Sequence, residues 1–179
     1  MFYKDERLAL FIDGTSLHSA SRSLEFEIDY KLLRQEFMRR GRLARVHYYT
    51  CVNESDEYTP VKPLVDWLSY NGFAVLSKPV REYTDAMGRK KIKGSIGIEL
   101  ATDAMSMAGH VDHIVIFSGD GDYCCLVQAL QRAGVRVTVV STQKSQPPMV
   151  SDELRRQADN FIDICDLRDV ICRPEKHAE

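Results

Sequence analysis

The sequence lacks an N-terminal apolar segment that could act as a signal peptide or cross a membrane. The apolar run before Asp13 covers only Leu8 to Ile12, whereas a membrane span needs about 20 apolar residues and a signal-peptide core about 7 to 15. The five cysteines are an odd number and include no CxxC pair, so neither a zinc site nor a disulfide framework is indicated. We therefore expect a reduced, soluble, cytoplasmic protein with no membrane association.

A strong charge of one sign is also lacking. The 24 Lys and Arg residues nearly balance the 26 Asp and Glu residues, which gives a net charge of −2 and a pI near 6.2. This argues against a uniformly basic nucleic-acid-binding protein but leaves the local distribution of charge open. The 179 residues, 44% of them hydrophobic, are enough for one compact domain with a sizeable core. We predict a single domain over residues 1–172 and a short charged tail over residues 173–179.

Short apolar runs alternate with longer segments of helical periodicity, the pattern of an α/β domain built on a mostly parallel sheet. The predicted strands cover residues 8–12, 44–49, 73–76, 113–117 and 135–140. The predicted helices cover residues 30–40, 61–70, 96–108 and 126–133. Strands that are apolar throughout indicate a sheet covered on both faces.

Two polar segments interrupt this alternation and are predicted to be surface loops. Residues 81–93 resemble a hairpin with its turn at residues 86–88. Residues 141–150 contain the pair Pro147 and Pro148, which disfavours both helix and sheet.

Acidic residues directly follow two of the predicted strands. Asp13 comes after the strand at residues 8–12, and Asp120 and Asp122 come after the strand at residues 113–117. Ligands of open parallel sheets gather outside the carboxyl ends of the strands, and carboxylates that converge there need a positive counter-charge. Mg²⁺ or Mn²⁺ is the expected ion because hard cations prefer carboxylate oxygens. The alternative is that these Asp-Gly pairs only form turns or cap helices.

Two further groups of charged residues could contribute to such a site. Asp103 lies in a predicted helix with Glu99 four residues earlier on the same face, although an acidic stripe on a helix is commonly just solvated. The segment from residue 78 to residue 93 has a local excess of positive charge that could hold a phosphate backbone or form an ordinary solvated hairpin. Its basic residues are Lys78, Arg81, Arg89, Lys90, Lys91 and Lys93.

Three motifs resemble those of the NYN domain, in the LabA-like branch of the PIN-like nuclease superfamily, and occur in the same order. Residues 11–17, FIDGTSL, resemble the opening FIDGxNL, residues 96–103 the VDVxLAxD helix, and residues 118–123, SGDGDY, the SGDGDF strand end. The resemblance spans nearly the whole chain. It implies an α/β, three-layer Rossmann-like fold with a mostly parallel sheet of five or six strands flanked by helices. It also implies a metal-dependent ribonuclease that hydrolyses RNA by activating water.

The motifs and the basic segment together predict roles for individual residues. The expected metal ligands are Asp13, Asp120 and Asp122, and the expected catalytic residues are these three with Asp103. The residues expected to bind RNA are Ser16, Ser118, Arg89, Lys90, Lys91 and Lys93.

Two positions depart from the family motifs. Ser16 stands where the family has Asn, and Gly97 stands where the helix motif has Asp. A hard-metal site that loses a carboxylate should bind its metal more weakly. The sequence therefore leaves a second function open, that of a catalytically weakened NYN module that binds RNA or a regulatory protein partner. A second copy of the chain is a further candidate partner.

Overall fold

The computed structural model describes residues 1–53 and 61–173, without the side chains of residues 53, 81–82 and 90–93. Within this part of the chain, seven strands form one sheet in the order β4-β3-β2-β1-β5-β6-β7. Neighbouring strands are parallel, except that β3 and β4 pair antiparallel. The strands are β1 (Arg7–Asp13), β2 (Arg42–Asn53), β3 (Ala74–Thr84), β4 (Lys90–Lys93), β5 (His113–Phe117), β6 (Arg136–Ser141) and β7 (Asn160–Asp163). The mostly parallel α/β sheet expected from the sequence is confirmed.

The sheet contains two strands beyond the five that the apolar runs indicate. β4 and β7 have four residues each and lie at the two edges of the sheet. Their sequences, KKIK and NFID, carry charged or polar residues, as edge strands commonly do to discourage pairing with other chains. The apolar pattern that identifies a buried strand is therefore missing from both.

The helices that periodicity predicts are confirmed, with boundaries shifted by a few residues. The helices are α1 (Gly14–Ser23), α2 (Tyr30–Arg40), α3 (Lys62–Tyr70), α4 (Gly97–Met107), α5 (Cys124–Arg132), α6 (Asp152–Gln157) and α7 (Arg168–Ile171), with 3₁₀ turns η1 (Gly121–Tyr123) and η2 (Ile164–Leu167). None of the helices in the described residues is long and apolar enough to span a membrane. Helix α1 was not predicted, since its mixture of Ser, His, Thr and Ala has no clear apolar stripe.

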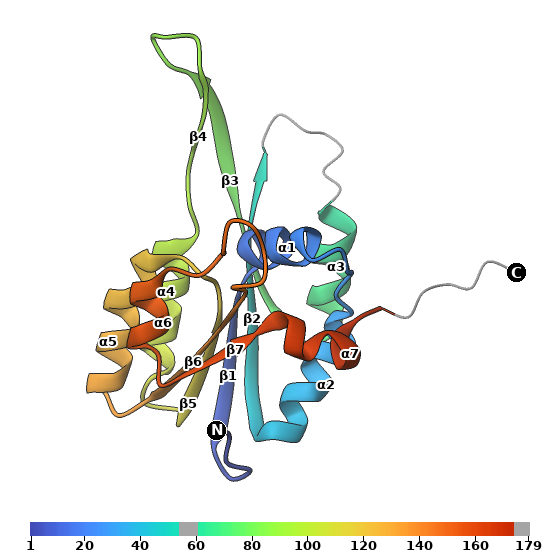
Figure 1. Ribbon diagram of the computed structural model, residues 1–179, viewed down its shortest axis with the longest axis vertical. Coiled ribbons are helices and arrows are strands. Elements are labelled where there is room, and N and C mark those ends of the chain that lie inside the picture. The colour runs from blue at the N-terminus through green and yellow to red at the C-terminus, as the bar shows by residue number, and fades with distance from the viewer. Residues whose placement is uncertain (54–60, 174–179) are drawn as a thin grey trace, which may run out of the picture.

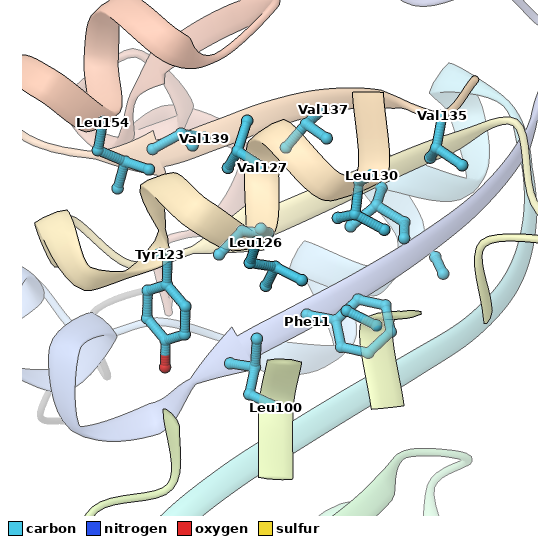
Figure 2. Packing of buried hydrophobic residues seen from close by; sticks show 14 of the residues in the cluster. Phe11, Leu100, Tyr123, Leu126, Val127, Leu130, Val135, Val137, Val139 and Leu154 are labelled. Atoms are coloured by element: carbon cyan, nitrogen blue, oxygen red, sulfur yellow. The ribbon is translucent and has the colours of Figure 1, made fainter. Parts of the chain in front are cut away.

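The helices cover the sheet on both faces and make a three-layer structure (Figure 1). Helices α4, α5 and α6 lie on one face, and α1, α2, α3 and α7 lie on the other. Alternate side chains of β1 point to opposite faces, so that Phe11 joins one apolar core while Leu10 and Ile12 join the other. In the first core, Val127 and Leu130 of α5 pack over the valines of β6 (Figure 2). The double burial of β1 explains why its sequence is apolar throughout.

Strands β1 and β5 are direct neighbours, which sets the position of the acidic residues. The two strands are parallel, and Ile12 pairs with Phe117. Asp13 and Ser118, the next residue in each strand direction, therefore leave the sheet side by side at its carboxyl edge. From the sequence alone, we could predict that these segments meet only if the two strands are neighbours in the sheet.

The two predicted loops behave differently from one another. Residues 81–93 form the predicted hairpin, in which β3 and β4 project beyond the body of the protein (Figure 1). Residues 141–150 were predicted to be a surface loop, but Ser141 ends β6, and Thr142, Ser145 and Val150 are buried. Burial is tolerated because the polar groups are satisfied within the loop and by its neighbours: the Thr142 hydroxyl donates to Asp163 Oδ1 at 3.0 Å, and the Ser145 hydroxyl donates to the Pro147 carbonyl at 2.9 Å.

Candidate active site

Asp13 ends β1 and caps helix α1. Its Oδ1 accepts a hydrogen bond from the Ser16 backbone N–H at 3.1 Å, and its Oδ2 accepts one from the Ser16 hydroxyl at 2.7 Å. Only 8% of Asp13 is exposed. The helix cap that the sequence allowed as an alternative is thus present, and it holds the carboxylate in a fixed orientation at the sheet edge.

Asp120 and Asp122 lie on the turn that follows β5. Asp120 caps the 3₁₀ turn η1 by accepting a hydrogen bond from the Asp122 backbone N–H at 3.0 Å. Ser118 connects this turn to β1, because its Oγ donates to Asp13 Oδ2 at 3.4 Å and accepts from the Asp120 N–H at 3.3 Å. The two distant acidic segments are therefore joined through one buried serine.

The turn after β5 is held in place by the buried loop at residues 142–151. The Gly119 carbonyl accepts a hydrogen bond from the Ser151 N–H at 2.9 Å. A Cβ atom at Gly119 would lie only 1.6 Å from the Met149 carbonyl oxygen. Only glycine therefore fits between β5 and this loop.

A cavity of about 880 Å³ opens at the carboxyl edge of β1 and β5. Its acidic part contains Asp13, Asp120 and Asp122, with Thr15 and Ser16. Residues of α4, the start of α5 and the base of the β3–β4 hairpin line the rest of it, together with Cys51 and Tyr123. These residues are Val80, Gly94, Ser95, Ile96, Gly97, Ile98, Ala101, Met105, Cys125 and Leu126. The three predicted metal ligands thus line one cavity.

Tyr123 also lines the cavity, with its hydroxyl near Gly97. Its ring is buried, with 5% of the residue exposed, and its hydroxyl oxygen points away from the packed valines of the core (Figure 2). Burial in the first place, and then the charges of the three aspartates, raise the pKa of this hydroxyl above its ordinary value. Tyr123 is therefore a neutral hydrogen-bond donor at physiological pH.

Gly97 is the first residue of α4 and lines the same cavity. A Cβ atom built there would meet the Tyr123 hydroxyl oxygen at 3.7 Å, an ordinary contact distance. The position where the family motif has Asp therefore faces the predicted site and has room for a side chain.

The structure does not place Asp103 among the residues that line the cavity. Its Oδ2 accepts a hydrogen bond from the Tyr49 hydroxyl at 2.8 Å, an interaction that, after burial, helps to raise the pKa of Tyr49. Glu99, one turn earlier, pairs with Lys78 Nζ at 2.5 Å, and this contact lowers the pKa of the Glu99 carboxyl. Both acids of α4 thus have partners on β2 or β3.

The basic segment is only partly brought to the site. Lys78 is bound to Glu99 and to the Ser95 carbonyl at 3.2 Å, so it supports the cavity wall. Arg89 pairs with Asp85 in the hairpin turn, with 66% of the Arg89 side chain exposed. Strand β4 is described, but the side chains of Lys90, Lys91 and Lys93 lie outside the described residues.

Sequence reasoning missed the apolar side of the cavity. Ile98, Ala101 and Met105 are three and four residues apart and so share one face of α4. The spacing was visible in the sequence, but apolar residues at helical spacing ordinarily indicate core packing. In the structure, Ile98 is 75% exposed and Met105 is 41% exposed, and all three residues line the cavity.

The carboxylates suit a hydrated ion better than a fully enclosed one. In the described part of the chain, no three His, Cys, Asp or Glu side chains lie together so that they could hold a metal ion by themselves. Mg²⁺ usually keeps several waters and is bound through one or two carboxylates plus substrate phosphates. Asp13 and Asp120 both line the cavity, and Ser118 links the segments that carry them.

The fold and the acidic cavity define a class of protein. The model of the NYN domain family matches residues 7–165, and the chain belongs to that family. NYN domains are PIN-like nucleases, which generally depend on divalent metal ions. The family resemblance inferred from the three motifs is confirmed.

Two known proteins are similar to this chain over nearly their whole length. "Low amplitude and bright protein LabA" of Synechococcus elongatus is 28% identical over 180 residues, which cover 98% of this chain and 93% of that protein. The crystal structure of VPA0982, a protein of unknown function from Vibrio parahaemolyticus, matches with a TM-score of 0.75 at 23% identity. That match covers 97% of this chain and 99% of the other. It shows the fold that the two proteins share.

Proposed function

We propose that this protein is a metal-dependent ribonuclease of the cytoplasm. The observation that carries the proposal is the convergence of Asp13, Asp120 and Asp122 on one cavity at the sheet edge of an NYN fold. Asp13 and Asp120 would hold Mg²⁺ or Mn²⁺, with Asp122 beside them. A bound divalent ion would supply a water of lowered pKa and would neutralise charge on the RNA phosphate.

The other predicted site residues would position the metal-binding aspartates and the RNA. Ser16 and Ser118 fix the Asp13 carboxylate through their hydroxyls, so they act on the RNA through Asp13. Arg89 and the lysines of β4 would bind the RNA backbone at the hairpin. Asp103 would hold Tyr49 in place, because their hydrogen bond occupies one of its oxygens.

Cleavage of single-stranded RNA by the purified protein with Mn²⁺ tests the proposal. Asp120→Asn removes one charge with almost no change of shape, and we expect it to slow cleavage by at least about 100-fold. The matched control is Asp66→Asn, because Asp66 is exposed on α3, in the layer on the opposite face of the sheet. Cleavage that survives in Asp120→Asn, or that chelation of metal leaves unchanged, would contradict the proposal.

A second function is favoured by Gly97, which leaves the cavity without the side chain that the family motif has there. In this case the protein would be a weakened NYN module that binds RNA without cutting it. Fluorescence anisotropy with labelled RNA separates the two functions: binding without Mn²⁺-dependent cleavage supports the module, and binding with cleavage supports the nuclease.

A further inference from the structure

The cavity is much larger than a phosphate and a hydrated ion require. Its volume of about 880 Å³ lies within the range of about 300–1,000 Å³ that is typical of sites for small organic ligands. Asp13, Asp120 and Asp122 make up only a small part of its lining. The rest of the lining is therefore available to a different part of the ligand.

Four apolar residues of the lining form what we call the apolar side of the cavity. Ile98, Ala101 and Met105 of α4 face the cavity, and Leu126 of α5 completes the wall. Phosphate groups and hydrated ions gain nothing from apolar surface, because burial there costs them hydration. A flat, largely apolar group such as a nucleobase gains from the same surface, as bases removed from a stack are commonly held between aromatic or apolar side chains.

The small side chain of Ala101 shapes this wall. It lies between Ile98 and Met105 along the helix, and both of these larger residues are substantially exposed. A small side chain flanked by two longer apolar side chains would leave room for the edge of a planar ring.

Hydrogen-bonding groups lie next to the wall. Tyr123 lines the cavity, so its hydroxyl can donate to a carbonyl oxygen of a base. Gly97 has no side chain to cover that hydroxyl, from which a Cβ atom there would lie 3.7 Å away. Ser95 also lines the cavity. A planar group on the apolar wall would thus meet polar partners at its edge.

We propose that the apolar side of the cavity, formed by Ile98, Ala101, Met105 and Leu126, holds one unpaired nucleobase of the RNA whose phosphate meets the aspartates. The inference rests on the proposed function and adds to it a binding site for one base. A base in a duplex would first have to leave its stack, which costs free energy. Unpaired bases are free to enter the cavity without that cost.

Abasic RNA tests the inference with the unaltered protein. A labelled single-stranded RNA is made in a series in which each position in turn lacks its base, and binding is measured by anisotropy without divalent metal. We expect one position to weaken binding about tenfold or more, because stacking of one base contributes about 1–3 kcal/mol. Annealing the complementary strand should weaken binding by a comparable factor.

A protein variant locates the effect in the cavity. Ala101→Phe should fill the space between Ile98 and Met105 and weaken binding of the intact RNA to the level of the sensitive abasic RNA. The effects of the substitution and of the missing base should therefore not be additive. Thr102→Phe adds the same bulk at an exposed neighbouring position that does not line the cavity, and should leave the difference between the two RNAs intact. Thermal melting checks the fold of both variants, and the abasic series decides the matter if Ala101→Phe does not fold.

The outcomes separate this inference from the proposed function. Equal binding of every abasic RNA, with Asp120-dependent cleavage still present, would overturn the base site and leave the ribonuclease standing. Absence of both binding and cleavage would overturn the two together.

Discussion

At the scale of single residues, Gly97 faces the cavity with only a hydrogen atom where the family motif has a carboxylate. Its helical position has room for a side chain, and a carboxylate in the first turn of a helix is favoured by the helix dipole. We expect Gly97→Asp to raise Mn²⁺-dependent cleavage at least about tenfold, equivalent to roughly 1.4 kcal/mol of transition-state stabilisation, with little loss of thermal stability.

Gly97→Asn is the matched control for this prediction. It has nearly the same size as Gly97→Asp and lacks the charge, so initial rates of RNA cleavage by the two variants isolate the effect of the carboxylate. Equal rates in both variants would mean that the position does not contribute to metal binding.

At the scale of elements, the turn after β5 and the loop at residues 142–151 act as one unit. Because a Cβ atom at Gly119 would collide with the backbone carbonyl of Met149, the loop would have to move. We expect Gly119→Ala to lower the free energy of unfolding by about 1–3 kcal/mol, the usual cost of overpacking, and to reduce cleavage through displacement of Asp120. Urea denaturation measures the stability.

Gly109→Ala serves as the control for this prediction, since nothing lies within 4 Å of a Cβ atom there. Equal denaturation midpoints for Gly119→Ala and Gly109→Ala would show that the loop moves aside without loss of stability.

At the scale of the whole molecule, a buried histidine links stability to pH. His113 is fully buried at the start of β5, with its Nδ1 3.2 Å from Glu6 Oε2 and its Nε2 2.7 Å from Thr138 Oγ1. Since a carboxylate can only accept, Nδ1 carries the proton and Nε2 accepts from Thr138. Burial, and next the charge of Arg136, lower the pKa of His113 below 6.5 even though Glu6 acts in the opposite direction.

The folded protein therefore keeps His113 neutral at pH values where the unfolded chain binds a proton. The contribution of the neutral His113 to the free energy of unfolding is fully present above pH 6.5. It falls as the pH drops below that value, by up to about 1.4 kcal/mol per pH unit. We expect His113→Gln to flatten the pH dependence of the unfolding free energy between pH 7.5 and pH 5, measured by urea denaturation. Replacement of the exposed His18 by Gln should preserve the slope, and an unchanged slope in His113→Gln would refute the assignment.

The sequence by itself determined the class of fold, most of the helices and the acidic strand ends. Strands buried on both faces must be apolar throughout, and helices need a repeating apolar face, so both leave a local record. The motifs around Asp13 and Asp120 are equally local, which is why the family could be identified from them.

Only the tertiary structure decided which residues share the cavity. Edge strands β4 and β7 carry too little apolar surface to be recognised, and the burial of residues 142–151 depends on contacts with Gly119 and Asp163 from distant segments. The rotation of α4 against the sheet is likewise set by packing of the whole core, and it turns Asp103 toward Tyr49 while Gly97 and Ala101 face the cavity. Such long-range packing leaves no local pattern in the sequence, because the residues that flank each contacting residue are compatible with several different tertiary contacts.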